Sequence, residues 1–182
     1  LKSKLATQVL LGDEVRVLEK RDYRYRVAIP GQGDLEGWIQ QEAITFPRDK
    51  GRSYLNPERE WIIVSAPKTE ALILDKTGNH KVPLYGGTRL PVLEKKQAGY
   101  KVQFPDHSPA IIDFADAMPV KSVDPVVNNT RPEEIANTAK RFVGVRYLAG
   151  GMTSQGMDMS GLISITYRIH GVPVGRARAG IR

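Results

Sequence analysis

The chain has no cysteine among its 182 residues. This absence excludes disulfide bonds, thiolate metal ligands and catalysis by a thiol. The three histidines, His80, His107 and His170, are scattered along the sequence and make no convincing zinc site. No glycine-rich loop with phosphate-binding spacing precedes a helix. The sequence therefore predicts neither a metal nor any other cofactor.

Long apolar runs are also missing, since no stretch approaches the roughly 20 residues that a membrane-spanning helix needs. Aromatic residues make up only 7% of the chain, so no single module is expected to have a large core. The chain starts at Leu1 without a charged, apolar leader. We therefore expect a processed form from which any export signal peptide has been removed.

Positive charge is in excess, with 27 Lys and Arg against 20 Asp and Glu and a net charge of +7. A basic surface favours polyanionic partners, among them the anionic polymers of a cell wall. The densest basic pairs, Lys20–Arg21 and Lys95–Lys96, lack the interleaved aromatics of a nucleic-acid stacking surface. Nucleic acid is therefore not predicted as a partner.

One segment of the first half is repeated. The run GDEVRVLEK at 12–20 matches GTRLPVLEK at 87–95, and the similarity continues without a gap to Pro30 and Pro105. Both copies alternate apolar and charged residues, which is the period of half-buried antiparallel strands. Turn-rich residues and a further short strand follow each proline. Two copies of a small barrel module explain this pattern better than chance.

The pattern changes period after a polar linker at 123–130. Apolar residues then recur at helical spacing over 131–144, which predicts a first helix. A second helix is expected from Asp158, as its N-cap, to His170, with Gly171 ending it.

Two parts of the sequence resemble known families. The run from Gly12 to Ile39 resembles the bacterial SH3-like (SH3b) module. Residues 141–176 resemble the start of the NlpC/P60 cysteine peptidases, which cut peptidoglycan stem peptides, typically after γ-D-glutamate. The residues that match this second pattern are Phe142, Gly144, Tyr147, Gly150, Gly151, Gly156, Asp158, Ser160, Gly161, Leu162, Tyr167 and Gly171.

These resemblances imply a mainly β N-terminal part followed by a helical part. The expected divisions are a first SH3-like barrel at 1–50, a second at 58–122, the linker at 123–130 and a partial NlpC/P60 domain at 131–182. That last division would be the first, helical part of an α+β papain-like domain.

The resemblance to the peptidases breaks down at the nucleophile. In the family, a cysteine begins the second helix, where the helix dipole favours its thiolate, and a histidine further along the chain acts as its base. Met159 occupies the cysteine position, and a thioether has no proton to lose. The sequence ends 23 residues later, before the expected histidine. The resemblance thus implies a degenerate, truncated domain with no intact catalytic residue.

Four residues are candidates for substrate binding. Tyr147 and Asp158 match family positions near the nucleophile, where the free amine of a stem peptide is received. Ser160 and Trp38 complete the set. Three of them also have a structural interpretation: Asp158 as a helix cap, Tyr147 as a packed ring and Trp38 as a core residue. Ser160 has no visible base that would make it a nucleophile.

The sequence thus predicts an envelope protein, periplasmic or extracellular, that binds peptidoglycan stem peptides or another anionic wall polymer without hydrolysing them. Whether the chain is an enzyme stays open at this point. One alternative is a non-catalytic SH3b module that binds wall polymer or a partner. Another is an engineered or truncated form of an active peptidoglycan endopeptidase. Self-association through the exposed helices of a half domain is a further expectation.

Overall fold

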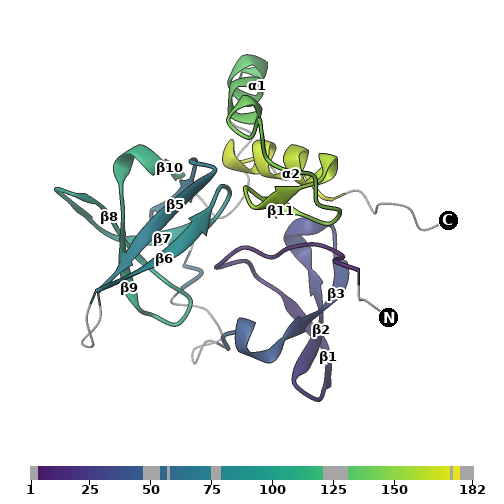
Figure 1. Ribbon diagram of the computed structural model, residues 1–182. Helices are drawn as coiled ribbons and strands as arrows, with labels where there is room; N and C mark the ends of the chain where they lie inside the picture. Colours follow the sequence, from purple (N-terminus) through teal and green to yellow (C-terminus); the bar gives the residue numbers. More distant parts are fainter. Residues whose placement is uncertain are drawn as a thin grey trace.

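The computed structural model describes residues 4–46, 54–56, 58–74, 79–120, 131–172 and 174–176. Strands dominate this part of the chain, which contains sheets of three, seven and two strands and two α-helices. Figure 1 shows the three-stranded sheet in purple, the seven-stranded sheet in teal, and the helices in green and yellow. No helix of the described residues is long and apolar enough to cross a membrane.

The first sheet is antiparallel, with the order β1 (Arg16–Arg21), β2 (Arg24–Ile29), β3 (Leu35–Gln40). Asp22 closes the β1–β2 turn with a positive φ of 52°, a conformation that aspartate tolerates. The 3-10 helices η1 (Pro30–Gln32) and η2 (Gln41–Ala43) follow β2 and β3. Only the end of β2 is buried, so this sheet supplies little core of its own.

The second sheet has the order β10-β4-β7-β8-β9-β5-β6 and encloses the larger core. Gly99 is required at the β7–β8 turn, because it has a φ of 149° and an added Cβ would lie 2.2 Å from the Ile112 carbonyl oxygen. The 3-10 helix η3 (Phe114–Asp116) precedes the last strand. The strands are β4 (Trp61–Val64), β5 (Lys68–Ile73), β6 (His80–Tyr85), β7 (Arg89–Lys96), β8 (Gly99–Gln103), β9 (Pro109–Ile112) and β10 (Ala117–Val120).

The repeated segments form the same local structure. The β1–β2 hairpin shifts register between Val17 and Glu19, and the β7–β8 hairpin shifts between Val92 and Glu94, at equivalent places of the repeat. The prediction of two small SH3-like barrels is nevertheless wrong. The first copy lies in a three-stranded sheet, whereas the second is part of a seven-stranded one.

The difference arises outside the repeat. The fully buried strand β4 pairs with β7 on one side and β10 on the other, which enlarges the second sheet. The second copy of the repeat begins at Gly87, after β4, so the repeat gives no information on that strand. The domain boundaries at 1–50, 58–122 and 131–182 stay a prediction. The predicted linker 123–130 lies outside the described residues.

The C-terminal part contains α1 (Pro132–Lys140), a hairpin of β11 (Met152–Thr153) and β12 (Gly156–Met157), and α2 (Met159–Ile169). Both predicted helices are present, although α1 ends at Lys140 and turns follow to 144. The predicted N-cap of α2 is confirmed, because the Asp158 side chain accepts a hydrogen bond from Gly161 N. The expectation of a first, helical part is corrected, because the β11–β12 hairpin lies between the two helices where a loop was expected.

This part shares a second core with the rest of the molecule. Leu10 of the N-terminal segment (residues 4–15, before β1) is buried in it. Tyr85 and Met118 of the seven-stranded sheet pack against it. Its other buried members come from the C-terminal part: Phe142, Met152, Met157, Ile165 and Ile169. Three parts of the molecule, namely the N-terminal segment, the seven-stranded sheet and the C-terminal part, therefore fix the position of α2.

Candidate functional site

Met159 begins α2, and its side chain is 76% exposed. Tyr147 is 78% exposed and forms an isolated parallel bridge with Met157, two residues before Met159. The hydrogen bonds Leu148 N to Met157 O and Met157 N to Arg146 O, both 3.1 Å long, hold these segments together. The structure thus brings the Tyr147 segment beside the start of α2. Tyr147 is not a packed ring.

Asp158 is only 9% exposed, and both of its carboxylate oxygens are occupied. Its Oδ1 accepts from Ser160 Oγ at 2.8 Å and from Gly161 N at 2.7 Å. Its Oδ2 accepts from Gly150 N at 2.8 Å and from Arg176 Nη2 at 2.5 Å. Burial raises the pKa of Asp158, but these hydrogen bonds and the Arg176 charge outweigh it and lower the pKa below its usual value.

Arg176 is the buried partner of Asp158, and the sequence reasoning missed it. Its Nη1 donates to Thr7 Oγ1 at 2.8 Å and to Gly150 O at 2.9 Å. Its Nη2 also donates to Ser160 Oγ at 3.1 Å. Asp158 and Arg176 are 18 residues apart, and no local pattern connects a capping aspartate with a later arginine. The ion pair ties the start of α2 to the Gly150 loop and to the N-terminal segment.

The N-terminal segment is held by a second set of polar contacts. Gln8 Oε1 accepts from Met152 N at 2.6 Å, and Gln8 O accepts from Gln32 Nε2 at 2.8 Å. Gln32 is 1% exposed and its Oε1 accepts from Thr7 Oγ1 at 2.6 Å. The segment therefore connects the first sheet with the β11–β12 hairpin. No sequence motif pointed to these glutamines.

Trp38 lies on β3 opposite Arg26 of β2, and it is half exposed rather than part of a core. Its neighbour Gly37 approaches Ala6, with 3.8 Å between the position of an added Cβ and the alanine Cβ. Leu5 of the same segment crowds Gly150, where an added Cβ would lie 2.4 Å from the Leu5 carbonyl oxygen. The strand that carries Trp38 is therefore linked to the α2 region through residues 5 and 6.

No base for nucleophilic catalysis accompanies these residues in the described part of the chain. Ser160 Oγ is engaged by Asp158 and Arg176. His170 is the C-cap at the far end of α2, and its Nε2 lies 2.8 Å from Thr138 Oγ1. His107 Nδ1 lies 2.9 Å from Gln103 Nε2, and His80 begins β6, so both belong to the seven-stranded sheet region. Among the residues described, no group of acidic and histidine side chains could hold a metal ion.

Comparisons with known proteins give relatives of one kind. No family model matches the chain. A γ-D-glutamyl-L-lysine dipeptidyl-peptidase of Bacillus cereus (strain ATCC 10987) is 28% identical over 181 residues, covering 96% of this chain and 53% of that protein. The protein of the same name from Bacillus subtilis (strain 168) is 24% identical over 178 residues, with coverages of 94% and 55%. The chain thus spans about half the length of the curated relatives it matches.

A solved structure agrees with these relatives. The crystal structure of an NlpC/P60 family protein from Bacillus cereus superposes with a TM-score of 0.82 at 26% identity. The match covers 94% of this chain and 57% of that one. The comparisons therefore support the relationship to the NlpC/P60 family that the residues around Asp158 indicate.

Proposed function

We propose that the chain is a cell-envelope member of the NlpC/P60 family that binds peptidoglycan stem peptides and does not cleave them. The observation behind this proposal is an exposed methionine, Met159, at the first position of α2, beside the exposed ring of Tyr147. The curated relatives carry the name of peptidases that act on a γ-D-glutamyl-L-lysine bond.

Binding is supported by the polar contacts that hold the residues around Met159 in place. The Asp158–Arg176 pair fixes the first turn of α2 and the Gly150 loop at the same time. A surface held in place before a ligand arrives loses less entropy on binding. The net charge of +7 suits the carboxylates of a γ-D-glutamyl peptide and of anionic wall polymers.

The absence of cleavage is supported by the chemistry of the same residues. The sequence has no cysteine, and a thioether cannot form the anionic nucleophile that amide cleavage by a thiol requires. Ser160 Oγ donates a hydrogen bond to the Asp158 carboxylate, which is paired with Arg176 and has a lowered pKa, so it is a weak base. In the part of the chain that the structure describes, Ser160 Oγ contacts Asp158 and Arg176 and no histidine.

The binding part is tested by titrating the 182-residue chain with the peptide L-Ala-γ-D-Glu-L-Lys and recording amide NMR shifts. We expect saturable shifts at residues 147–161. Tyr147→Ala should weaken the affinity by about tenfold or more, in the range found for a central aromatic contact. Tyr23→Ala is the matched control, because Tyr23 is 75% exposed at the β1–β2 turn. Equal affinities of the two variants would refute the placement of the peptide-binding site beside Tyr147.

A further inference from the structure

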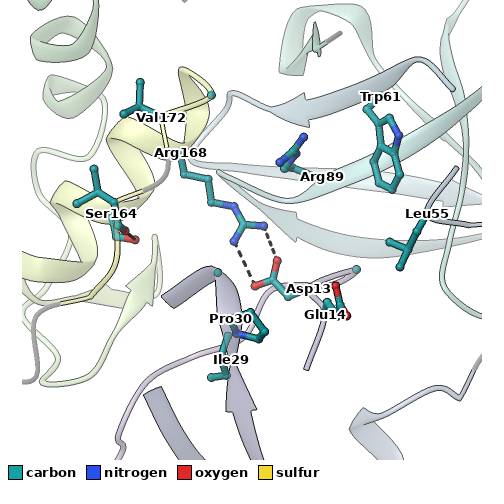
Figure 2. Close-up of a pocket in the computed structure, with 14 residues that line it drawn as sticks. Asp13, Glu14, Ile29, Pro30, Leu55, Trp61, Arg89, Ser164, Arg168 and Val172 are labelled. Carbon is teal, nitrogen blue, oxygen red and sulfur yellow. Dashed lines mark hydrogen bonds and ion pairs between the residues drawn. The ribbon is translucent and has the colours of Figure 1, made fainter. Parts of the chain in front are cut away.

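A cavity of about 270 Å³ lies where the N-terminal segment, the seven-stranded sheet and the end of α2 meet. Figure 2 shows Trp61 and Arg89 of the sheet on one side of it, with Asp13 and Glu14 on the other. The side chain of Arg168 extends from α2 to Asp13. All three parts of the described chain contribute walls, so the cavity exists only in the assembled molecule.

An ion pair forms a fixed wall of this cavity. The guanidinium of Arg168 donates to both carboxylate oxygens of Asp13, and its Nε donates to Gly87 O at 2.7 Å. Leu10 N also donates to Asp13 Oδ2, at 3.1 Å. Because these two charges are largely buried and satisfy each other, they shape the cavity and are not its ligand-binding groups.

Two further charges of opposite sign line the cavity from opposite walls. Glu14 is an exposed carboxylate of the N-terminal segment, and Arg89 is a guanidinium at the start of β7. Arg89 also interacts within the chain, but a guanidinium has five N–H donors and can hold a second acceptor. Apolar wall is supplied by Leu55, Trp61 and Val172.

We propose that this cavity binds a small zwitterion of dipeptide size, with its ammonium group against Glu14 and its carboxylate against Arg89. The volume is close to the lower end of small-molecule sites, about 300 Å³, which favours a ligand of this size. The inference is independent of the stem-peptide proposal. Arg168 lies nine residues along α2 from Met159, about 14 Å at the rise of an α-helix.

The test is an NMR titration of the 182-residue chain with L-alanyl-L-alanine. We expect saturable amide shifts at residues 12–14 and 171–172. N-acetylation of the dipeptide, which removes the ammonium charge, should weaken binding about tenfold or more, and so should amidation of its carboxylate. Glu14→Gln should reproduce the first loss, and Arg89→Met the second. Glu36→Gln and Arg24→Met, at exposed positions of the first sheet, are the matched controls.

Three results would overturn the proposal. One is no saturable shift up to about 10 mM dipeptide. Another is equal binding of the free and the blocked dipeptides. The third is unchanged affinity in the folded Glu14→Gln variant. Should Arg89→Met not fold, the amidated dipeptide tests the same contact in the unaltered chain. Loss of stem-peptide binding in Tyr147→Ala would not bear on this cavity, because Tyr147 is not among its lining residues.

Discussion

Asp158 shows how a residue near the proposed site is used to hold the chain together. Its carboxylate is largely buried and accepts four hydrogen bonds, one of them from Arg176, with which it forms an ion pair. Its role as a helix cap could be predicted from the sequence, because capping depends on residues three positions apart. The ion pair could not be predicted, because it depends on how residues 174–176 fold back. The exposure of Tyr147 and Met159 likewise depends on tertiary packing.

Asp158→Asn is therefore expected to destabilise the protein strongly. The change leaves the Arg176 charge buried without a counter-charge, which costs about 3–5 kcal/mol in comparable pairs. Urea unfolding measures this loss. The control is Glu36→Gln, which breaks an exposed pair with Arg26 and should cost less than about 1 kcal/mol. Similar losses in the two variants would contradict the structural role assigned to Asp158.

The same carboxylate predicts a dependence of stability on pH. The pKa of Asp158 is lower in the folded state than in the unfolded chain, where it is about 3.9. Its contribution is therefore present above about pH 4 and is lost as the pH falls through the folded-state pKa. We expect the free energy of unfolding of the unaltered chain to decrease more steeply below about pH 4 than that of Asp158→Asn. Parallel curves would contradict this assignment.

At the scale of elements, local patterns predicted strands and helices better than they predicted sheets. The repeat indicated two hairpins, and both form with the same bulge. Sheet membership depends on β4 and β10, which pair with each other across more than 50 residues. Period-2 alternation gives no information on such long-range partners. The prediction of two small SH3-like barrels failed for this reason.

Contact between α2 and the Gly150–Gly151 loop depends on a glycine. A Cβ added at Gly161 would lie 2.1 Å from Gly151 O, so Gly161→Ala must push the helix from the loop. We expect a loss of about 1–3 kcal/mol in urea unfolding, as for other overpacked sites. Replacing glycine by alanine inside a helix otherwise stabilises it by about 1 kcal/mol. A loss of stability in Gly161→Ala would therefore show that the contact with the loop outweighs this gain. Gly31→Ala is the control, since an added Cβ there meets nothing within 4 Å.

On the scale of the whole molecule, the three parts share one buried cluster, and Arg168 connects all of them. It lies on α2, pairs with Asp13 of the N-terminal segment and donates to Gly87 O before β7. Gly87 itself packs against α2, where an added Cβ would lie 3.0 Å from Ile165 Cδ1. The described parts should therefore unfold together in one transition.

Arg168→Met tests this connection. Asp13 would be left buried without a counter-charge, and we expect a loss of about 3 kcal/mol or more together with a broader unfolding transition. Calorimetry and near-ultraviolet circular dichroism of the same sample measure both effects. Arg24→Met, at an exposed position of the first sheet, should leave the transition unchanged. A sharp transition at unchanged stability for Arg168→Met would show that the parts do not depend on this arginine.

The proposal that this molecule recognises a wall peptide but leaves it intact is tested most directly by prolonged incubation. The 182-residue chain is mixed in excess with L-Ala-γ-D-Glu-L-Lys, and the peptide is followed by mass spectrometry. The chemistry of Met159, and the lack of a base beside it among the described residues, predict that the tripeptide mass persists and that no free lysine appears. Release of lysine at a rate proportional to the protein concentration would contradict the account.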